Sequence, residues 1–581
     1  TEIYTLHIVG SVDVYKRQVA TDPADFSYQL NAGGDGYIVT GYPAAKGQSG
    51  SYATSIVLPD YYQGKIVFSI ADNAFEGDGL TAVTLGANIW TIGANAFRNN
   101  QLKTIKIPDG VWSIGAGAFA DNALTSVDLT NTTTIDEGAF QNNQLTDLVI
   151  PDKVGQIDAD AFEGNQITTL KLGQGLKTID TAAFQHNQIQ GNLVLPDSLT
   201  GLGVDAFAEN KLNSVTLDSG LTLLNTGVFK DNQLTGTLTL PETITSVGDD
   251  AFTNNQLTGL KLSQNLTSIG TAAFAHNRIN SSLVLPDKLT NLGDEAFNDN
   301  QLNSVTLNDK INGIGTQTFA NNPTLTGVLN LPDNIQHVGE QAFYGDNLTG
   351  ITGGTQLQTI DQEAFFGNKL TGTLNLADTL QAIGTSAFMG NHLQGLLNGA
   401  ALTTIGDNAF MGNDLSGTLA LSSTVLAIGS YAFADNQLRG VTGLDNLTMI
   451  NNGTFQNNQL TGDLTLSNKI TNVGVNAFSG NALAHLQFGT DDSSDVVTLG
   501  DDAFAYNNLQ TIVSKGKIES IGTDAFAHQI LKAADADATV KNVNGIVTTT
   551  VTNIREALKQ QLGTIDLADL VFTLTEDLGQ N

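Results

Sequence analysis

The sequence predicts a β-rich solenoid of about 21 coils, most of them 22–23 residues long. Three observations predict this fold class. A phenylalanine returns 21 times at this spacing, as in "NAFRNNQL" at 95–102. An asparagine stands three residues later in 18 of the 21 copies, and a short alternating run follows, as in "LKTIKIP" at 102–108. A period of about 20 to 50 residues is typical of a stacked array, in which each repeat buries its apolar face against its neighbours.

The recurring phenylalanine, from Phe75 to Phe526, is the predicted anchor of each coil. We expect its ring to be buried and stacked on the ring of the next coil, which contributes about 1.5–3 kcal/mol per ring before entropy is counted. Four residues before the anchor, the column holds Gly in 14 copies, Asp in 4 and Asn in 2. Because these residues adopt the left-handed backbone conformation most easily, the column predicts a corner with positive φ.

The remaining columns predict the rest of a coil. The amide of the recurring asparagine is expected to bond the backbone of its own turn and of the next coil. The alternating run predicts a strand with Leu102, Ile105 and Ile107 facing inward. Val111 and Ile114 predict a second short segment that closes the coil.

A longer period overlies the first one and indicates that the array grew by duplication of pairs of coils. Coils of 22 and 23 residues tend to alternate, the longer ones carrying one inserted residue, as in "LTGTLTLP" against "LNSVTL". A proline recurs every 45 residues at Pro151, Pro196, Pro241 and Pro286.

Composition excludes several classes of function. The chain of 581 residues has 58 acidic and 25 basic residues, a net charge of −33, which argues against nucleic acid and anionic membranes as partners. It has no cysteine, so disulfides, thiolate metal sites and cysteine nucleophiles are excluded. No apolar run approaches the roughly 20 residues that span a bilayer, so we expect no membrane insertion. The ends carry no convincing signal peptide or wall-sorting motif, so the chain is expected to be a fragment.

The pattern "L-x-x-I-x-L-P-x-x-L-x-x-I-G-x-x-A-F-x-x-N-x-L" resembles the BspA-like leucine-rich repeats of bacterial surface proteins, over roughly residues 37–529. That resemblance implies a right-handed leucine-rich-repeat solenoid with short helical or 3-10 turns. The family often has cysteine where this chain has asparagine. The acidic, asparagine-rich style looks most like lactobacilli and their relatives. It implies a Gram-positive surface adhesion protein, extracellular or cell-wall associated.

The expected organisation has four parts. Residues 1–18 lack the repeat register and are a leader or an artefact, and residues 19–70 form an N-terminal cap with the first coil. Residues 71–530 form the solenoid. Residues 531–581 are a C-terminal cap or the start of a small α+β module, with an amphipathic helix around Ile554, Leu558 and Leu562 and a strand within 566–577.

The sequence predicts neither catalysis nor a metal or cofactor site. The seven histidines are dispersed, and paired carboxylates such as Asp249 and Asp250 fall in the repeated corner, where solvated turn residues are expected. The acidic run "DDSSD" at 491–495 could hold calcium, although an ordinary acidic loop is favoured. Phosphate loops, nucleophile elbows and zinc spacings do not occur.

One candidate binding surface is the outward column of the first strand. It includes Lys106, Asp128 and Lys171 and otherwise holds mainly Thr, Val and Asn. Good β-propensity on a continuous sheet explains this composition without a function. The functional alternative is a long groove of low charge for a glycan or a peptide.

The second candidate is an outward aromatic ladder of Phe68, Trp90 and Trp112, which follow one another at 22-residue spacing and include both tryptophans of the chain. Exposed aromatic rings in a row suit stacking on sugar faces or anchoring of a partner. Alternatively, the N-terminal cap with Tyr61 and Tyr62 folds over these rings and buries them.

The expected function is binding without catalysis, to host glycan, mucin or an extracellular matrix protein, by a monomeric surface adhesin. The alternative is a rigid stalk that presents another domain. A screen for glycan and mucin binding separates these two functions.

Overall fold

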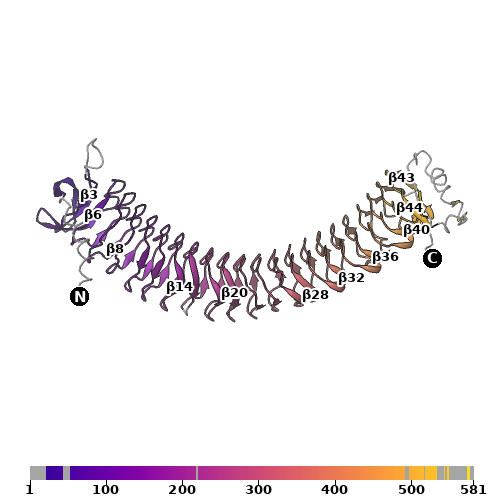
Figure 1. The fold of residues 1–581 in the computed structure, drawn as a ribbon, viewed down its shortest axis with the longest axis horizontal. Helices are drawn as coiled ribbons and strands as arrows, with labels where there is room; N and C mark the ends of the chain where they lie inside the picture. The colour runs from indigo at the N-terminus through magenta and orange to yellow at the C-terminus, as the bar shows by residue number, and fades with distance from the viewer. Residues whose placement is uncertain are drawn as a thin grey trace, which may run out of the picture. The chain divides into compact units, whose positions relative to one another are not determined.

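The computed structural model describes residues 21–43, 53–217, 220–490, 496–515, 517–532, 542–543, 546–547 and 572–575. The chain divides into two compact units, Thr1–Ile279 and Asn280–Asn581. Figure 1 shows the coils following one another in chain order within each unit. The predicted leader at 1–18, the acidic run at 491–495 and the predicted helix around Ile554 lie outside the described residues.

The N-terminal end of the first unit differs from the coils that follow it. It contains the 3-10 helix η1 (Pro23–Asp25) and the strands β1 (Ser27–Leu30), β2 (Gly36–Gly41), β3 (Ser55–Val57), β4 (Tyr61–Tyr62) and β5 (Lys65–Ile70). β1 pairs with β2 and β4 with β5 in antiparallel fashion, whereas β2 and β5 are parallel. The ring of Phe26 stands edge-on to the first anchor ring, Phe75, at 6.1 Å between centroids. This end therefore covers the apolar stack that an open solenoid would expose.

Each coil of the first unit has two extended segments. The first segments form β6 (Ala82–Thr84), β10 (Asp147–Val149), β12 (Thr169–Lys171), β14 (Gln190–Val194), β16 (Lys211–Thr216), β18 (Thr235–Thr239) and β20 (Gln256–Lys261). The second segments form β7 (Thr91–Ile92), β8 (Ser113–Ile114), β9 (Thr134–Ile135), β11 (Gln156–Ile157), β13 (Thr178–Ile179), β15 (Gly201–Leu202), β17 (Leu223–Leu224), β19 (Ser246–Val247) and β21 (Ser268–Ile269). β5, β7, β8, β9, β11, β13 and β15 are successive parallel strands of a ten-stranded sheet that also contains β1, β2 and β4.

The second unit repeats this architecture. Its first segments form β22 (Ser282–Val284), β24 (Ser304–Thr306), β26 (Thr326–Leu331), β28 (Asn347–Gly353), β30 (Thr371–Asn375), β32 (His392–Leu397), β34 (Ser416–Ala420), β36 (Gln437–Thr442), β38 (Thr461–Leu466), β40 (Ala482–Phe488) and β42 (Thr511–Ser514). Its second segments form β23 (Asn291–Leu292), β25 (Gly313–Ile314), β27 (His337–Val338), β29 (Thr359–Ile360), β31 (Ala382–Ile383), β33 (Thr404–Ile405), β35 (Ala427–Ile428), β37 (Met449–Ile450), β39 (Asn472–Val473), β41 (Val496–Leu499) and β43 (Lys517–Ile521).

Four short strands follow the last coil. β44 (Gln529–Lys532) pairs in parallel with β47 (Phe572–Thr575), which lies within the strand predicted at 566–577. β45 (Asn542–Val543) and β46 (Ile546–Val547) form a small antiparallel pair.

Most first strands pair in twos, which gives the two-coil period of the sequence a structural counterpart, whereas β38, β40 and β42 form a three-stranded sheet. The pairs in the first unit are β3–β6, β10–β12, β14–β16 and β18–β20. From β14 onward, the pairing register of most of these pairs shifts directly after a glycine of the upstream strand with φ between 71° and 86°, namely Gly191, Gly236, Gly327, Gly372, Gly417 and Gly462. The longer and the shorter coil thus adjust to each other beside a residue with a positive φ, which glycine adopts without strain.

The anchor rings stack as predicted. From Phe75 to Phe274 in the first unit, successive ring centroids lie 5.0–5.9 Å apart, beginning with Phe75 and Phe97 at 5.0 Å and an interplanar angle of 2°. Every anchor of both units is at most 2% exposed. The β-rich solenoid is confirmed, with coil corners that are turns and η1 as the one helix of the described residues.

The predicted position of the positive-φ corner is wrong. Positive φ occurs two residues before and two residues after each anchor in all 21 coils, as at Asn95 (53°) and Asn99 (55°) around Phe97. Gly93, four residues before this anchor, is instead required by packing. A Cβ atom there would lie 2.6 Å from the backbone of Ala71 and Asp72 in the preceding coil. The column is rich in glycine because the backbones of two neighbouring coils approach each other there.

The asparagine column bonds the backbone of its own turn as predicted, but the second coil that it bonds is the preceding one and not the next one. Asn143 Nδ2 donates to the carbonyl oxygen of Phe119 in the preceding coil at 2.9 Å and to that of Phe140 in its own turn at 3.1 Å. Its Oδ1 accepts from the backbone N–H of Leu124 at 3.0 Å. The amide therefore satisfies buried backbone groups of two consecutive coils.

Candidate binding surface

Two tryptophans stand exposed on consecutive coils of the first unit. Trp90 and Trp112 each directly precede a second-segment strand, β7 and β8, and their side chains are 47% and 52% exposed. The backbone N–H of Trp112 donates to the carbonyl oxygen of Trp90 at 3.1 Å, and that of Trp90 to Phe68 at 2.8 Å. The three residues therefore form the expected ladder at strand spacing.

The cap covers one rung of this ladder. Phe68 is half-buried, its ring centroid 5.5 Å from that of Trp90. Gly36 of β2 packs against it so closely that a Cβ atom would lie 2.6 Å from Phe68 Cδ1. Tyr62 stacks on Tyr28 within the cap at 3.9 Å. Among the described residues, covering by the cap thus applies to Phe68, whereas the two tryptophans remain exposed.

The candidate residues of the first-strand column are all exposed. Lys106, Asp128 and Lys171 occupy the same column together with Val149, which is 58% exposed. Thr130 donates its backbone N–H to Asp128 Oδ1 at 3.0 Å and its hydroxyl at 2.5 Å. These bonds, more than the charge of Lys106, hold the pKa of the Asp128 carboxyl below its usual value. The carboxylate is therefore ionised and fixed in orientation.

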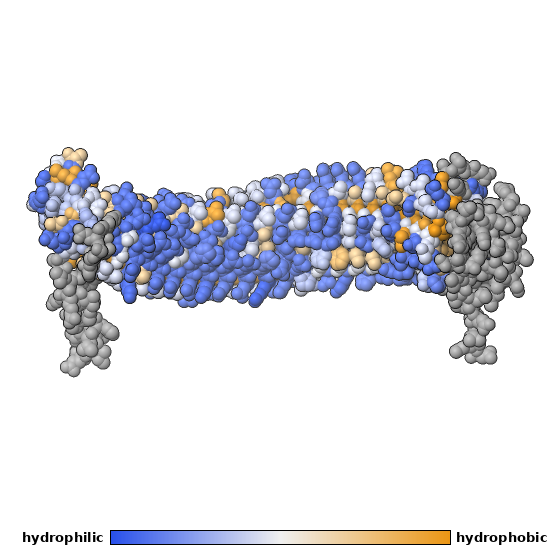
Figure 2. Space-filling model, turned by 90° about the horizontal axis from the view of Figure 1, so that it is seen from above, coloured by the Kyte–Doolittle hydropathy of each residue, from blue (hydrophilic) through white to orange (hydrophobic). Residues whose placement is uncertain are grey.

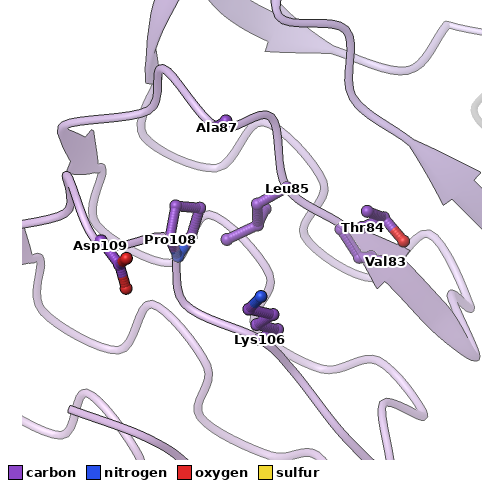
Figure 3. A pocket seen from close by; sticks show the side chains of 7 residues that line it. All are labelled: Val83, Thr84, Leu85, Ala87, Lys106, Pro108 and Asp109. Atoms are coloured by element: carbon purple, nitrogen blue, oxygen red, sulfur yellow. The ribbon is translucent and has the colours of Figure 1, made fainter. Parts of the chain in front are cut away.

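Residues 104–108 and 123–129 form no strand, so the pairing of first strands is interrupted between β6 and β10. Two hollows lie along this interruption. The first, of about 470 Å³, is lined by Val83, Thr84, Leu85, Ala87, Lys106, Pro108 and Asp109 (Figure 3). The second, of about 510 Å³, has residues of 127–130 and 147–152 and Lys171 in its wall. The three polar residues predicted for this column thus border the two hollows.

Sequence reasoning missed the hollows and six of the seven residues that line the first one, all except Lys106. The run at 102–108 alternates like its equivalents in other coils, so nothing in its pattern indicates that it stays unpaired. Strand pairing between coils depends on tertiary packing, which a local pattern does not encode.

The described histidines with printed ion pairs lie beside carboxylates of the next coil. The shortest contact joins His186 Nδ1 and Glu209 Oε2 at 2.7 Å, with both side chains more than 40% exposed. Within the described part of the chain, no group of three or more His, Cys, Asp or Glu residues could hold a metal ion. No described helix is long and apolar enough to cross a membrane. Figure 2 shows a face on which hydrophilic residues predominate and hydrophobic ones form separate patches.

Residues 68–190, 157–280, 273–394 and 426–547 match the BspA type leucine rich repeat region, a family defined on six copies of the repeat. The chain belongs to this family. A search of curated proteins finds no match.

Three solved structures illustrate what the chain is similar to. A leucine rich cell surface protein from Faecalibacterium prausnitzii A2-165 is 20% identical, over 65% of this chain and 95% of its own, with a TM-score of 0.38. A leucine-rich repeat protein from Bacteroides ovatus ATCC 8483 is 17% identical, over 77% and 94%, with a TM-score of 0.37. The pneumococcal vaccine antigen PcpA is 18% identical, over 71% and 93%, with a TM-score of 0.35.

Proposed function

We propose that this BspA-type repeat protein is a binding protein of a bacterial surface, extracellular or cell-wall associated, that recognises a host glycan, mucin or matrix protein without catalysis. The observation that carries the proposal is the pair Trp90 and Trp112, exposed by about half on consecutive hydrogen-bonded coils. Exposed tryptophan is unfavourable in water, and two in register form an apolar surface that a ligand can cover.

The position of the two rings favours recognition for a second reason. Tryptophan has only two side-chain torsions, and here its backbone is fixed by hydrogen bonds to both neighbouring coils. Little conformational entropy remains to be lost on binding, so most of the interaction energy appears as affinity. An indole face also matches the C–H face of a sugar ring or an apolar side chain.

Immobilised mucin, released mucin glycans and a matrix protein such as fibronectin are the probes for a binding experiment with the full chain. We expect one of these probes to bind, and the double variant Trp90→Ala/Trp112→Ala to weaken that binding by at least about tenfold, as loss of a tryptophan hot spot does. Leu223→Ala is the matched control, because Leu223 is also an exposed apolar residue of a second-segment strand, 44% exposed. Equal affinity of the double variant and the control would remove the ladder from the account.

A rigid stalk that presents another domain is the second candidate function. It is favoured by the stack of anchor rings within each unit and by the asparagine bonds that link neighbouring coils there. The same binding experiment distinguishes the two functions. A full chain that binds none of the probes supports the stalk and contradicts the binding function.

A further inference from the structure

We propose that the ligand of the tryptophan ladder is a neutral glycan and that one of its sugar units occupies the hollow around Lys106. This inference rests on the proposed function and names the ligand class. The hollow is the one lined by Val83, Leu85, Lys106, Pro108 and Asp109 together with Thr84 and Ala87.

The hollow and the ladder adjoin each other at a single turn. Pro108 and Asp109 line the hollow, and Gly110 follows them directly. A Cβ atom on Gly110 would lie 3.4 Å from Trp90 Cδ1, so the indole ring rests against this turn. A chain of sugars that stacks on Trp90 therefore has the hollow within reach around the turn.

The chemistry of the hollow matches a sugar. Figure 3 shows Leu85 and Pro108 pointing toward each other, which gives an apolar wall for the C–H face of a ring. Lys106 offers hydrogen-bond donors and Asp109 offers acceptors. Sugar hydroxyl groups both donate and accept, so they can pair with both. The volume of about 470 Å³ lies within the usual range of small-ligand sites.

Charge selects a neutral sugar over an acidic one. The single positive and the single negative side chain of the hollow cancel, while the whole chain carries −33. A carboxylated or sulfated glycan would approach against this field, whereas a neutral one is not repelled. The second hollow strengthens the preference, because Asp128, Asp147 and Asp152 outnumber Lys171 along its wall.

The two tryptophans provide a direct readout, because the chain has no others. The experiment titrates the full chain with released mucin glycans, either desialylated or still sialylated, and follows tryptophan emission and acrylamide quenching. We expect the desialylated glycans to shift the emission to the blue and to protect it from quenching. The sialylated glycans should bind at least tenfold more weakly. Lys106→Ala and Asp109→Ala should each weaken binding of the neutral glycan severalfold, whereas Lys103→Ala, an exposed lysine of the same coil outside the hollow, should not.

The outcomes separate this inference from the proposed function. Two results would contradict the proposal that a neutral sugar occupies the hollow, while leaving binding at the ladder intact. One is stronger binding of the sialylated glycans, and the other is unchanged affinity in both Lys106→Ala and Asp109→Ala. Binding of the matrix protein alone also overturns the inference and leaves the function. Failure of every probe to bind contradicts both.

Discussion

The backbone N–H of Asn322 donates to Oδ1 of Asp346 at 2.7 Å, and Asp346 occupies the column that holds asparagine in 18 coils. Its side chain is 1% exposed, and its Oδ2 has no hydrogen-bond partner. In the next coil the equivalent amide, Asn368 Nδ2, donates to the carbonyl oxygen of Phe343 at 2.7 Å. An ionised carboxylate has no proton to donate, so Asp346 is satisfied in this column only when protonated.

Stability of the second unit should therefore fall as the pH rises. Burial raises the pKa of Asp346 to about 8, above its value in the unfolded chain. Its contribution is then complete below the unfolded pKa of about 4 and is lost as the pH rises from there through about 8, by up to about 1.4 kcal/mol per pH unit. Thermal unfolding at pH 5 and pH 9 measures the loss. Asp346→Asn should remove most of it, whereas Asp309→Asn, at an exposed site, should not. A loss of the same size in Asp346→Asn would contradict this assignment.

Glycine at a positive-φ corner should stabilise the first unit. Ala272 lies two residues before Phe274 with φ of 51°, a conformation that costs an alanine about 1–2 kcal/mol. Ala272→Gly relieves this strain, but glycine gains entropy in the unfolded chain, which offsets part of the benefit. We therefore expect the free energy of unfolding to rise by up to about 1 kcal/mol. The neighbouring Ala273 is buried and has no positive φ, so Ala273→Gly is the control and should destabilise. Urea unfolding measures the change in the free energy of unfolding of both variants. A change of the same sign in Ala272→Gly and Ala273→Gly would refute the explanation.

Loss of one ladder asparagine should destabilise the stack. Asn143→Ala removes the bonds to two anchor carbonyls and to the Leu124 amide, all buried. Unsatisfied buried groups cost about 1–3 kcal/mol each, so we expect a loss of several kcal/mol, reduced where water enters. Gln144→Ala, one residue on and exposed, should change stability by less than about 0.5 kcal/mol. Similar unfolding midpoints for the two variants would mean that the amide is dispensable.

Truncation of a single anchor ring should be costly without breaking the fold. Phe140 is fully buried between Phe119 and Phe162, each with its ring centroid 5.5 Å away. Phe140→Ala should cost about 3–5 kcal/mol, since the neighbouring backbones keep the coils too far apart to fill the cavity. Hydrogen exchange should show the loss concentrated in coils adjacent to Phe140, because each repeat contacts only its neighbours. Uniform loss over the whole first unit would contradict such local coupling.

The features that recur in every coil could be predicted from the sequence, because each coil carries the residues that produce them. Phe97 and Asn100 recur at fixed spacing, and their burial and amide bonds follow from one coil stacked on another. Gly93 misleads because glycine serves both positive φ and close approach, and a column of residue types does not distinguish them. The columns two residues before and two residues after the anchor hold Gly, Asn or Asp in 13 and 16 of the 21 coils, so the positive φ had a signal there, although Ala272 and His276 do not share it.

The candidate surface was predictable only in part. Trp90 and Trp112 could be placed on one face because their 22-residue spacing equals the repeat. The hollow beside Lys106 depends on whether the first segments of neighbouring coils pair, which is decided by tertiary packing. Its lining residues, Leu85 and Pro108, are ordinary members of their columns.

Hydrogen–deuterium exchange of the full chain, with and without desialylated mucin glycans, tests the central claim most directly. The account predicts slower exchange on binding in residues 83–113, which hold both tryptophans and the hollow, and unchanged exchange in the coils of the second unit. Protection confined to the second unit, or none at a saturating concentration of glycan, would contradict it.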